Sequence, residues 1–450
     1  YSGQPPLYAW IQHLAFGLFG RNLFSLALVK NGLLFLAYLF FWLTARRHWP
    51  DRPTLVSLTV LSWLLIPQVV WEAQRDLSHS VMVLTVSAAT LYLVVRGLRS
   101  WGCESNPGPG VAWYAVLGLL VGLGMLSKYN FVVFAGALSL ALLSLPEGRA
   151  LVLNPRILVG LGCALVVSAP HFAWAVDHWE VAVRSLSKVD AVAGNNRIVG
   201  LGVLFLAVVS FLTPLWLMWA GFFPGLFRRA KARGDTLTGR LAQRYLVALI
   251  AGLTVGILAL GVGHVKERWM IPLLFVAPLY FFSGAGENGL RASRVRWFRR
   301  VAAAAAVVTL VAAGLRSLLG PSLGVMTRVN YPFDPVAREL SAVAPEHPYV
   351  LTHNTWFAGN LVKRLPGARG YVPGYVLPKP GEEGPVLVVW DAVRSEPLPR
   401  ELREDLEGRF GLDPGPVPPT YLTFPYKFGA GREARVGYLV VDGSSRRPPT

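Results

Sequence analysis

The chain has 450 residues, of which 53% are hydrophobic and only 15% are charged. Because soluble globular domains carry about 25% charged residues, this composition excludes an ordinary soluble enzyme, a disordered chain and a small disulfide-held protein. The net charge of +18 does not indicate nucleic-acid binding, because the basic residues lie in short stretches between apolar runs and form no patch interleaved with aromatic residues. The pattern predicts a polytopic membrane protein with a soluble C-terminal part.

Apolar runs of membrane-spanning length follow one another along residues 1–319. A helix needs about 20 mostly apolar residues to cross a hydrocarbon core of ~30 Å, and on this basis we expect about ten spans. Pro67 and the following Trp71 and Glu72 end the second run early. The runs lie at 23–45, 53–70, 79–96, 111–127, 130–146, 156–175, 198–222, 243–262, 268–284 and 300–319.

The basic residues predict how these spans are oriented. The loops after the odd-numbered spans are strongly basic, for example around Arg46, Arg228 and Arg299, whereas the other loops are closer to balance. Because cytoplasmic loops carry an excess of Lys and Arg, the basic loops are predicted to face the cytoplasm. We therefore expect a multi-pass protein of the inner (cytoplasmic) membrane that begins and ends outside the cytoplasm.

The C-terminal residues 320–450 change in character. Short β-rich segments flanked by Gly and Pro alternate with two helical segments, which is typical of a small α/β domain. The strands are expected at 348–352, 384–390 and 436–442, and the helices at 334–343 and 399–410. The predicted architecture is mostly α, with a transmembrane helical bundle at 1–319 and a small α/β domain on the outer face at 320–450.

The first polar cluster lies at the start of the chain. Gln4 precedes Pro5 and Pro6, which fix an extended backbone and then begin a helix, because proline suits a first helical turn. Tyr8 and Trp10 follow on this helix. The alternative interpretation is an interfacial helix start that carries an aromatic belt.

The second and third clusters contain ionisable residues at helix ends. Asp76 and His79 are three residues apart and share one helix face, although Asp76 also suits a plain N-cap. The third cluster begins with glycines at 118, 122 and 124, which allow close helix approach. It ends in Lys128 and Tyr129, where the lysine either belongs to a site or snorkels to the interface.

The fourth cluster runs from His264 to Pro272 and brings Lys266 and Arg268 to the mouth of a helix. A Lys and an Arg together suit an anionic phosphate, and the alternative is an anchor to anionic lipid headgroups. A looser fifth group surrounds His171 and His178, but its spacing fits no metal signature.

These clusters, in this order, resemble the membrane glycosyltransferases of the GT-C fold. The closest resemblance is to the dolichyl-phosphate-mannose–protein mannosyltransferases (family 39) and the ArnT-like group, and it covers essentially the whole chain. The motifs are Gln4-Pro5-Pro6-Leu7-Tyr8-x-Trp10, Gly122-Leu-x-x-Leu-Ser-Lys128-Tyr129, Arg268-Trp269-x-x-Pro272, and Ala358-Gly-Asn-Leu361 with Leu365-Pro366 in the tail. Two positions depart from the family pattern: Gln4 replaces a charged residue, and Trp269 replaces a tyrosine.

The resemblance implies an inverting transfer, on the outer face, of a sugar from a polyprenyl-phosphate donor to a glycan, lipid or protein acceptor. It places the base, an acidic residue, upstream of Tyr1, in a segment that we expect to precede this sequence. Some members use a divalent metal ion, so such an ion of unspecified identity is a candidate cofactor. Membrane lipids are the other expected partners, and nucleic acid is not one.

On this reading we assign each cluster a role in the transfer. Lys128, Lys266 and Arg268 bind the donor phosphate, and Asp76 is a second acidic group that orients the acceptor or a metal. The sugar and acceptor pocket is formed by Gln4, Tyr8, Trp10, His79, Tyr129 and Trp269. The alternative functions are a lipid or solute transporter, which often shows inverted repeats that we do not find here, and a sensory or structural membrane protein.

Overall fold

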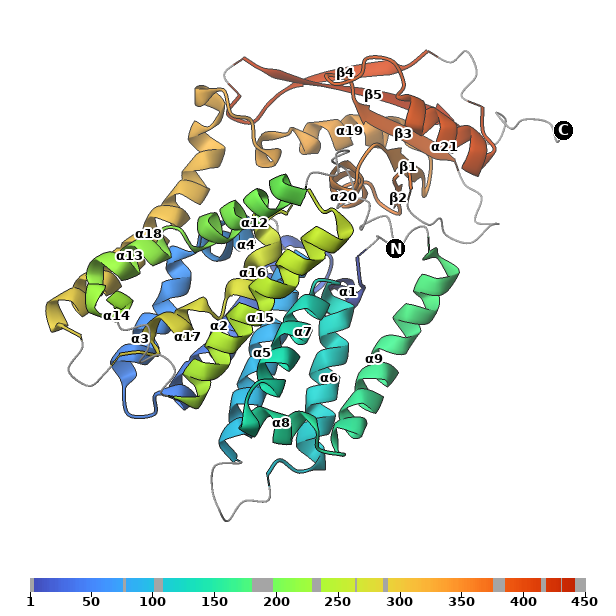
Figure 1. Ribbon diagram of the computed structural model, residues 1–450. Coiled ribbons are helices and arrows are strands. Elements are labelled where there is room, and N and C mark those ends of the chain that lie inside the picture. Colours follow the sequence, from blue (N-terminus) through green and yellow to red (C-terminus); the bar gives the residue numbers. More distant parts are fainter. Residues whose placement is uncertain are drawn as a thin grey trace. The chain divides into compact units, whose positions relative to one another are not determined.

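Figure 1 shows the computed structural model of the chain, which divides into two compact units, one of Gly3–Thr309 and one that comprises Leu310–Thr450. The structure describes residues 4–75, 78–100, 108–179, 197–228, 236–263, 265–285, 290–374, 385–413, 418–429 and 431–441. The division falls inside helix α18, Ala292–Leu319, whose last turns therefore group with the C-terminal unit.

The N-terminal unit is called the membrane unit below. Every regular element among its described residues is a helix. Its elements are α1 (Leu7–Phe19), α2 (Leu23–His48), α3 (Pro53–Leu61), η1 (Ser62–Leu65), η2 (Gln68–Glu72), α4 (Ala73–Arg75), α5 (Ser78–Ser100), α6 (Val111–Ser127), α7 (Phe131–Leu143), α8 (Pro146–Val152), α9 (Ile157–Asp177), α12 (Arg197–Leu212), α13 (Leu215–Phe222), α14 (Pro224–Arg228), α15 (Leu237–Leu260), η4 (Glu267–Met270), α16 (Ile271–Leu274), α17 (Ala277–Phe282) and α18.

Five of these helices, α2, α5, α9, α15 and α18, are long and apolar enough to cross a membrane by themselves. Two bent pairs raise the number to seven if each counts as one span: α7 with α8, bent by 120°, and α12 with α13, bent by 61°. This is fewer than the ten spans expected from the sequence. The run at 111–127 matches α6 to the residue but is short, and the runs at 53–70 and 268–284 form shorter pieces.

Proline accounts for these breaks. Pro67 precedes η2, Pro146 begins α8, Pro214 precedes α13, and Pro272 and Pro278 stand at the starts of α16 and α17. Because proline lacks a backbone N–H and clashes with the preceding turn, it starts a helix more easily than it continues one. The hydropathy of such a run shows only that it is apolar and does not show where the helix breaks. The sequence analysis therefore predicted one span where the structure has two or more short helices.

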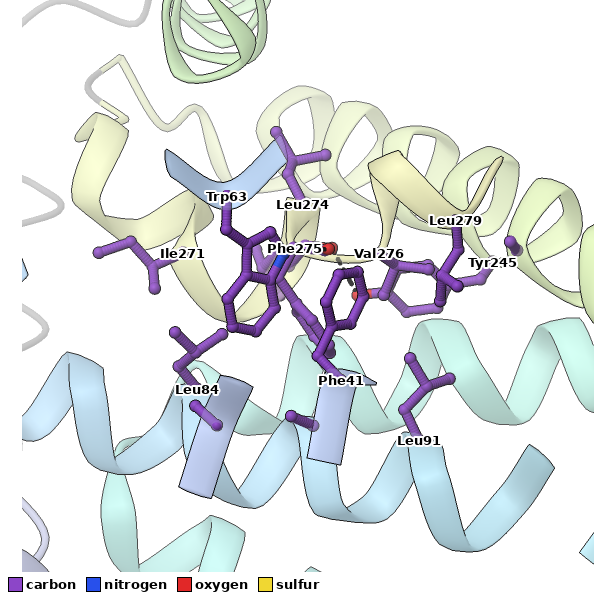
Figure 2. Close-up of a cluster of buried hydrophobic side chains, with 14 of the residues drawn as sticks. Phe41, Trp63, Leu84, Leu91, Tyr245, Ile271, Leu274, Phe275, Val276 and Leu279 are labelled. Atoms are coloured by element: carbon purple, nitrogen blue, oxygen red, sulfur yellow. Dashed lines mark hydrogen bonds between the residues drawn. The ribbon is translucent and has the colours of Figure 1, made fainter. Parts of the chain in front are cut away.

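The broken segment α16–α17 is held by the buried core shown in Figure 2. The Trp63 ring stacks on Phe41 with 4.3 Å between the ring centroids, and its indole Nε1 donates to the Phe275 carbonyl at 3.1 Å. The Tyr245 hydroxyl donates to the Leu273 carbonyl at 2.8 Å. These side chains satisfy carbonyls that a helix end leaves without an intrahelical partner. The core thereby fixes the segment that directly follows Lys266–Trp269.

Helices α6 and α9 lie side by side and pack closely through glycine. The sequence predicted that the glycines of α6 allow close helix approach, and the structure identifies α9 as the partner. A Cβ atom built on Gly118 would lie 2.0 Å from the Gly160 carbonyl oxygen, and one on Gly122 would lie 2.9 Å from Val167. The two backbones therefore approach each other where any larger residue would separate them. This contact anchors α6, whose last residue precedes Lys128.

The C-terminal unit contains the small α/β domain that the sequence predicted. Its five strands have the order β2-β1-β3-β5-β4, with β1 parallel to β2 and β3 and with β5 antiparallel to β3 and β4. The elements are η5 (Pro321–Leu323), η6 (Arg328–Asn330), α19 (Phe333–Val343), β1 (Tyr349–Thr352), α20 (Thr355–Val362), β2 (Arg369–Tyr371), β3 (Val386–Asp391), α21 (Arg400–Phe410), β4 (Thr420–Pro425) and β5 (Glu433–Val441).

Helices cover both faces of this sheet (Figure 1). Along β3, Val388 and Trp390 pack with residues of α21, whereas Leu387 and Val389 pack with residues of α19 and α20. This alternation follows from the strand geometry, in which successive side chains point to opposite faces. A central strand that is buried on both faces has a sequence that is apolar at every position, as residues 386–390 have.

Candidate functional site

Three consecutive residues in the turn between α6 and α7 connect three other segments of the membrane unit. Lys128 Nζ donates to Ser80 Oγ of α5 at 2.9 Å, and Asn130 Nδ2 donates to the Trp269 carbonyl of η4 at 3.2 Å. The Tyr129 hydroxyl lies 3.1 Å from His171 Nε2 of α9. Helix α6 ends at this point because Lys128 has an extended backbone, with φ −167° and ψ 138°.

The first two sequence clusters also meet. Pro6 is the N-cap of α1, and Tyr8 in the first turn is buried. Its ring lies 5.5 Å, between centroids, from the ring of His79 in the first turn of α5. His79 in turn contacts the backbone of Ser127, next to Lys128. Residues far apart in sequence thus form one group around the turn at 128–130.

The fourth cluster joins this group through η4. Gln68 Nε2 of η2 donates to Glu267 Oε2 at 2.8 Å, so the carboxylate of the cluster is bound by a neutral amide. The side chain of Arg268 is exposed, and its charge lies close enough to act on Lys128. Two positive charges that act on each other in this way favour the approach of an anion.

Several buried polar atoms of this region have no hydrogen-bond partner within the described residues. They are His79 Nδ1, Asn130 Oδ1, Gln68 Oε1 and both side-chain amide atoms of Gln12. A buried polar atom without a partner costs about 1–3 kcal/mol, so native proteins keep few of them unless water or a ligand satisfies them. Together with Lys128 and Arg268, these atoms can bind a ligand that is both anionic and rich in hydrogen-bonding groups.

We call this group the turn site. It comprises Tyr8, Gln12, Gln68, His79, Ser80, Lys128, Tyr129, Asn130, His171, Glu267, Arg268 and Trp269. Of the residues expected from the sequence, it brings together Tyr8, His79, Lys128, Tyr129, Arg268 and Trp269. Lys266 is half-buried at the N-cap of η4, directly before Glu267.

Of the remaining expected residues, Gln4 and Trp10 take part in none of the contacts given above for the described residues. Gln4 is half-buried just before the proline pair. Trp10 is 47% exposed and lies two residues after Tyr8, on another face of α1. Asp76 and His264 lie outside the described residues.

Sequence reasoning missed Gln12 and Gln68. Gln12 lies four residues after Tyr8 and so shares its helix face, and Gln68 is a polar residue inside the apolar run 53–70. An intramembrane polar residue is an indication of function in its own right, which would have been sufficient to select Gln68.

The described residues contain no group of three or more His, Cys, Asp or Glu side chains that could hold a metal ion. Of the loose fifth group, His171 bonds to Tyr129 and His178 Nδ1 lies 3.0 Å from the Trp174 carbonyl oxygen. The donor set present in these residues therefore does not fit a metal centre by itself.

The fold defines a class: multi-pass membrane proteins with a small C-terminal α/β domain. The family described as dolichyl-phosphate-mannose-protein mannosyltransferase matches residues 3–174. The chain is 32% identical over 456 residues to the lipopolysaccharide core galacturonosyltransferase RgtB of Rhizobium johnstonii. This alignment covers 98% of this chain and 89% of RgtB. The chain is 33% identical over 403 residues to RgtA of the same organism, which is also a lipopolysaccharide core galacturonosyltransferase. That alignment covers 87% of this chain and 78% of RgtA.

Among solved structures, apo ArnT from Cupriavidus metallidurans superposes with a TM-score of 0.55 at 17% identity, covering 100% of this chain and 89% of ArnT. The same protein bound to undecaprenyl phosphate gives a TM-score of 0.54. At such identity the likeness concerns the fold alone. The chain belongs to the family of membrane glycosyltransferases that includes these lipopolysaccharide core galacturonosyltransferases, and it shares the fold of ArnT. The predicted resemblance is confirmed, and the transporter alternative is not supported.

Proposed function

We propose that this glycosyltransferase moves a sugar of the galacturonic acid class from a polyprenyl-phosphate donor to a lipopolysaccharide core acceptor. The observation that carries the proposal is the convergence of Lys128 and Arg268 with unpaired buried polar atoms in the turn site. The names of the relatives RgtA and RgtB supply the sugar and the acceptor, and the undecaprenyl phosphate bound to ArnT supplies the donor class.

The reaction needs positive charge where the donor phosphate leaves. An acceptor hydroxyl oxygen attacks the anomeric carbon from the face opposite the phosphate. The bond from that carbon to the phosphate oxygen breaks with its electron pair, and the acceptor proton passes to an acidic base. The leaving phosphate gains one negative charge in this step, so cations that are already in position stabilise the transition state more than the ground state. We assign this role to Lys128, Lys266 and Arg268.

A uronic acid donor adds a second anionic group, the sugar carboxylate. Two anionic groups in one site need more than one fixed cation, and the Lys128–Arg268 pair meets this need. The hydrogen bond to Ser80 holds the Lys128 ammonium in place, whereas the exposed guanidinium of Arg268 presents a fork that suits carboxylate and phosphate alike.

The sugar itself is assigned to the aromatic part of the turn site. Tyr8, Tyr129 and Trp269 offer ring faces and polar edges, and His79 Nδ1 offers an uncommitted hydrogen-bonding atom. Gln4 and Trp10, which take part in none of the contacts described above, are proposed to meet the sugar from the start of α1. Asp76 is assigned to orienting the acceptor.

The distribution of charge along α5 supports transfer on the outer face of the inner membrane. His79 and Ser80 lie in the first turn of α5, whereas Arg96 and Arg99 lie near its end, about 25–30 Å away at 1.5 Å per residue. Arg99 lines a cavity of about 360 Å³ together with Arg46 and Arg47. Because basic ends face the cytoplasm, we infer that the turn site and the C-terminal unit lie outside it.

The test uses the purified full-length protein in nanodiscs, with a radiolabelled polyprenyl-phosphate galacturonate as donor and lipopolysaccharide as acceptor. Release of polyprenyl phosphate and transfer of label are measured together. Replacing Arg268 by Ala should reduce kcat by about 100- to 1,000-fold, the usual effect of removing one group that stabilises developing charge. The matched control is Arg296→Ala, an exposed arginine in the first turns of α18, which should retain full activity. Full activity of the Arg268→Ala protein would contradict the assignment.

A further inference from the structure

The C-terminal unit contains a pocket of its own, with a volume of about 460 Å³. This lies within the range of about 300–1,000 Å³ that is usual for small-molecule sites. Such sites are mostly apolar, but this pocket is lined mainly by polar and charged residues. They are Met326, Thr327, Arg328, Tyr331, His353, Asn354, Thr355, Trp356, Asp391, Arg394 and Tyr426. A hydrophilic ligand therefore fits this pocket better than an acyl chain does.

Two polar atoms of the lining are buried without a partner in the described residues. The Tyr331 side chain is only 5% exposed, and neither its hydroxyl nor His353 Nδ1 has a hydrogen-bond partner. Burial lowers the pKa of His353 below its ordinary value, so the ring is neutral at pH 7 and one of its nitrogens can accept a hydrogen bond. Such atoms are expensive to bury, and a ligand that carries hydroxyl groups would satisfy both.

One wall of the pocket is aromatic. The Trp356 ring meets Tyr331 edge to face, with 5.3 Å between centroids. The guanidinium of Arg328 lies 5.7 Å from the centroid of the Trp356 ring. Tyr426 packs edge to face against Tyr331 from another side, at 5.7 Å. Flat apolar faces beside hydrogen-bonding groups match a sugar ring, which has C–H faces and a hydroxylated rim.

The charged residues of the lining give the pocket a preference for a ligand that carries a carboxylate. Arg394 reaches Asp391 at 3.4 Å, but the arginine side chain is 79% exposed while that of Asp391 is 13% exposed. Asp391 Oδ1 also accepts from the Val393 backbone N–H at 3.2 Å. Both oxygens of the Asp391 carboxylate thus have partners in the protein, Oδ1 the Val393 N–H and Oδ2 the Arg394 Nε. The exposed end of the Arg394 guanidinium can still meet a second carboxylate at the pocket mouth.

We propose that this pocket binds an acidic sugar unit of the acceptor saccharide, through the Tyr331 hydroxyl, the His353 ring, the Trp356 face and the Arg394 guanidinium. This inference rests on the proposed function in one respect only, namely that the bound sugar belongs to the acceptor of the transfer. Binding of the sugar needs neither donor nor transfer. The pocket would hold an acceptor that the turn site modifies elsewhere on the same molecule.

The experiment measures binding of trigalacturonate to the full-length chain in nanodiscs, without donor, by saturation-transfer NMR and by titration calorimetry. The fully methyl-esterified trisaccharide is the neutral comparison on the same scaffold. Tyr331→Phe removes only the unpaired hydroxyl, so the fold should be retained. We expect it to weaken binding by about three- to tenfold, the effect of one hydrogen bond. Arg394→Gln and esterification should each weaken binding by about tenfold or more, as expected for a charge-assisted contact.

The matched control is Tyr421→Phe, which removes a tyrosine hydroxyl of the same unit that donates to the Glu396 carbonyl at 2.6 Å and does not line the pocket. Its affinity for trigalacturonate should equal that of the unsubstituted chain. The inference is overturned if trigalacturonate fails to bind at 10 mM, on the order of the weakest specific sites. Equal affinity of the Tyr331→Phe protein, or of the esterified probe, also overturns it.

Transfer assayed on the same preparations separates this inference from the proposed function. Arg268-dependent transfer without trigalacturonate binding would refute the pocket and leave the transferase assignment intact. Binding that depends on Tyr331, without transfer of galacturonate from any polyprenyl-phosphate donor, would support the pocket and refute the proposed function.

Discussion

Lys128, Tyr129 and Asn130 in the membrane unit each bond to a different segment. In the C-terminal unit, by contrast, the Tyr331 hydroxyl and His353 Nδ1 have no hydrogen-bond partner among the described residues, although the turn site also contains such atoms, for example Asn130 Oδ1. Of the two cations of the turn site, Lys128 donates to a serine hydroxyl at 2.9 Å, whereas Arg268 is exposed. In the aromatic pocket, defined by the lining around Tyr331 and Trp356, the arginine is 79% exposed. Charge inside a membrane protein is costly and has to be held in place, but a soluble domain can leave its charged groups to water.

The roles proposed for the two sites account for this difference. A group that stabilises developing charge must already be oriented when the bond breaks, since reorientation during the step would cost free energy. A site that only binds can leave side chains adaptable and still gain specificity from hydrogen bonds and ring contacts. Substitutions in the turn site should therefore affect kcat, and those in the aromatic pocket should affect KM for the acceptor.

The largest expected effect is on the stability of the membrane unit. Replacing Trp63 by Ala removes the stack on Phe41 and the bond to the Phe275 carbonyl. It should lower the free energy of unfolding by about 3–5 kcal/mol, as large-to-small core changes do. Thermal unfolding in nanodiscs measures it. The control is Trp297→Ala, a tryptophan of α18 that is 56% exposed and should change little. If both variants melt alike, the core in Figure 2 does not hold the broken segment.

The next effect sharpens the comparison between the two sites. Lys128→Met keeps the length of the side chain and removes its charge, so transfer should fall by about 100-fold. Trigalacturonate binding to the aromatic pocket should be unchanged, because Lys128 belongs to the other unit. Steady-state kinetics and calorimetry on one preparation measure both quantities. Lys128→Arg should restore part of the rate, since it restores the charge. If the Lys128→Met protein no longer bound trigalacturonate, the two sites would not be independent. That result would contradict the separate roles proposed for them.

The smallest effect concerns the pH stability of the C-terminal unit. Hydrogen bonds from Lys427 and Arg364, each 2.7 Å long, lower the pKa of Asp334 to about 2. A lowered folded-state pKa contributes stability above the unfolded-state pKa of about 4, and this contribution disappears as the pH falls from about 4 to about 2. Because the carboxylate is 53% exposed, solvent screens it and we expect at most about 1 kcal/mol.

Unfolding of the full chain between pH 2 and pH 7, followed by circular dichroism, checks this expectation. Asp334→Asn should be slightly less stable than the unsubstituted chain at pH 7 and equal to it near pH 2. Glu404→Gln, which breaks the exposed pair with Arg400 inside α21, provides the control and should show a smaller difference. A stability difference for Asp334→Asn that persists unchanged at pH 2 would contradict the role of its charge.

The sequence anticipated much of the turn site because its signals are local. An ionisable residue at the end of an apolar run is conspicuous in one dimension, so Lys128, Arg268 and His79 could be selected without any contact being known. Their partners could not be selected in this way. Gln68 bonds to a residue 199 positions away and Asn130 to one 139 positions away, and no spacing rule connects such pairs.

The sequence by itself determined the composition of the membrane unit, the exact bounds of α6, the capacity of its glycines for close helix approach and the α/β pattern of the C-terminal unit. These follow from hydrophobic periodicity, side-chain size and strand alternation, which are properties of neighbouring residues. Only the tertiary structure decided where the apolar runs break and bend, which polar atoms remain unpaired, and that Tyr331, His353, Trp356 and Arg394 line one pocket. These features depend on packing between segments that the chain brings together only on folding, so they leave no local trace in the sequence.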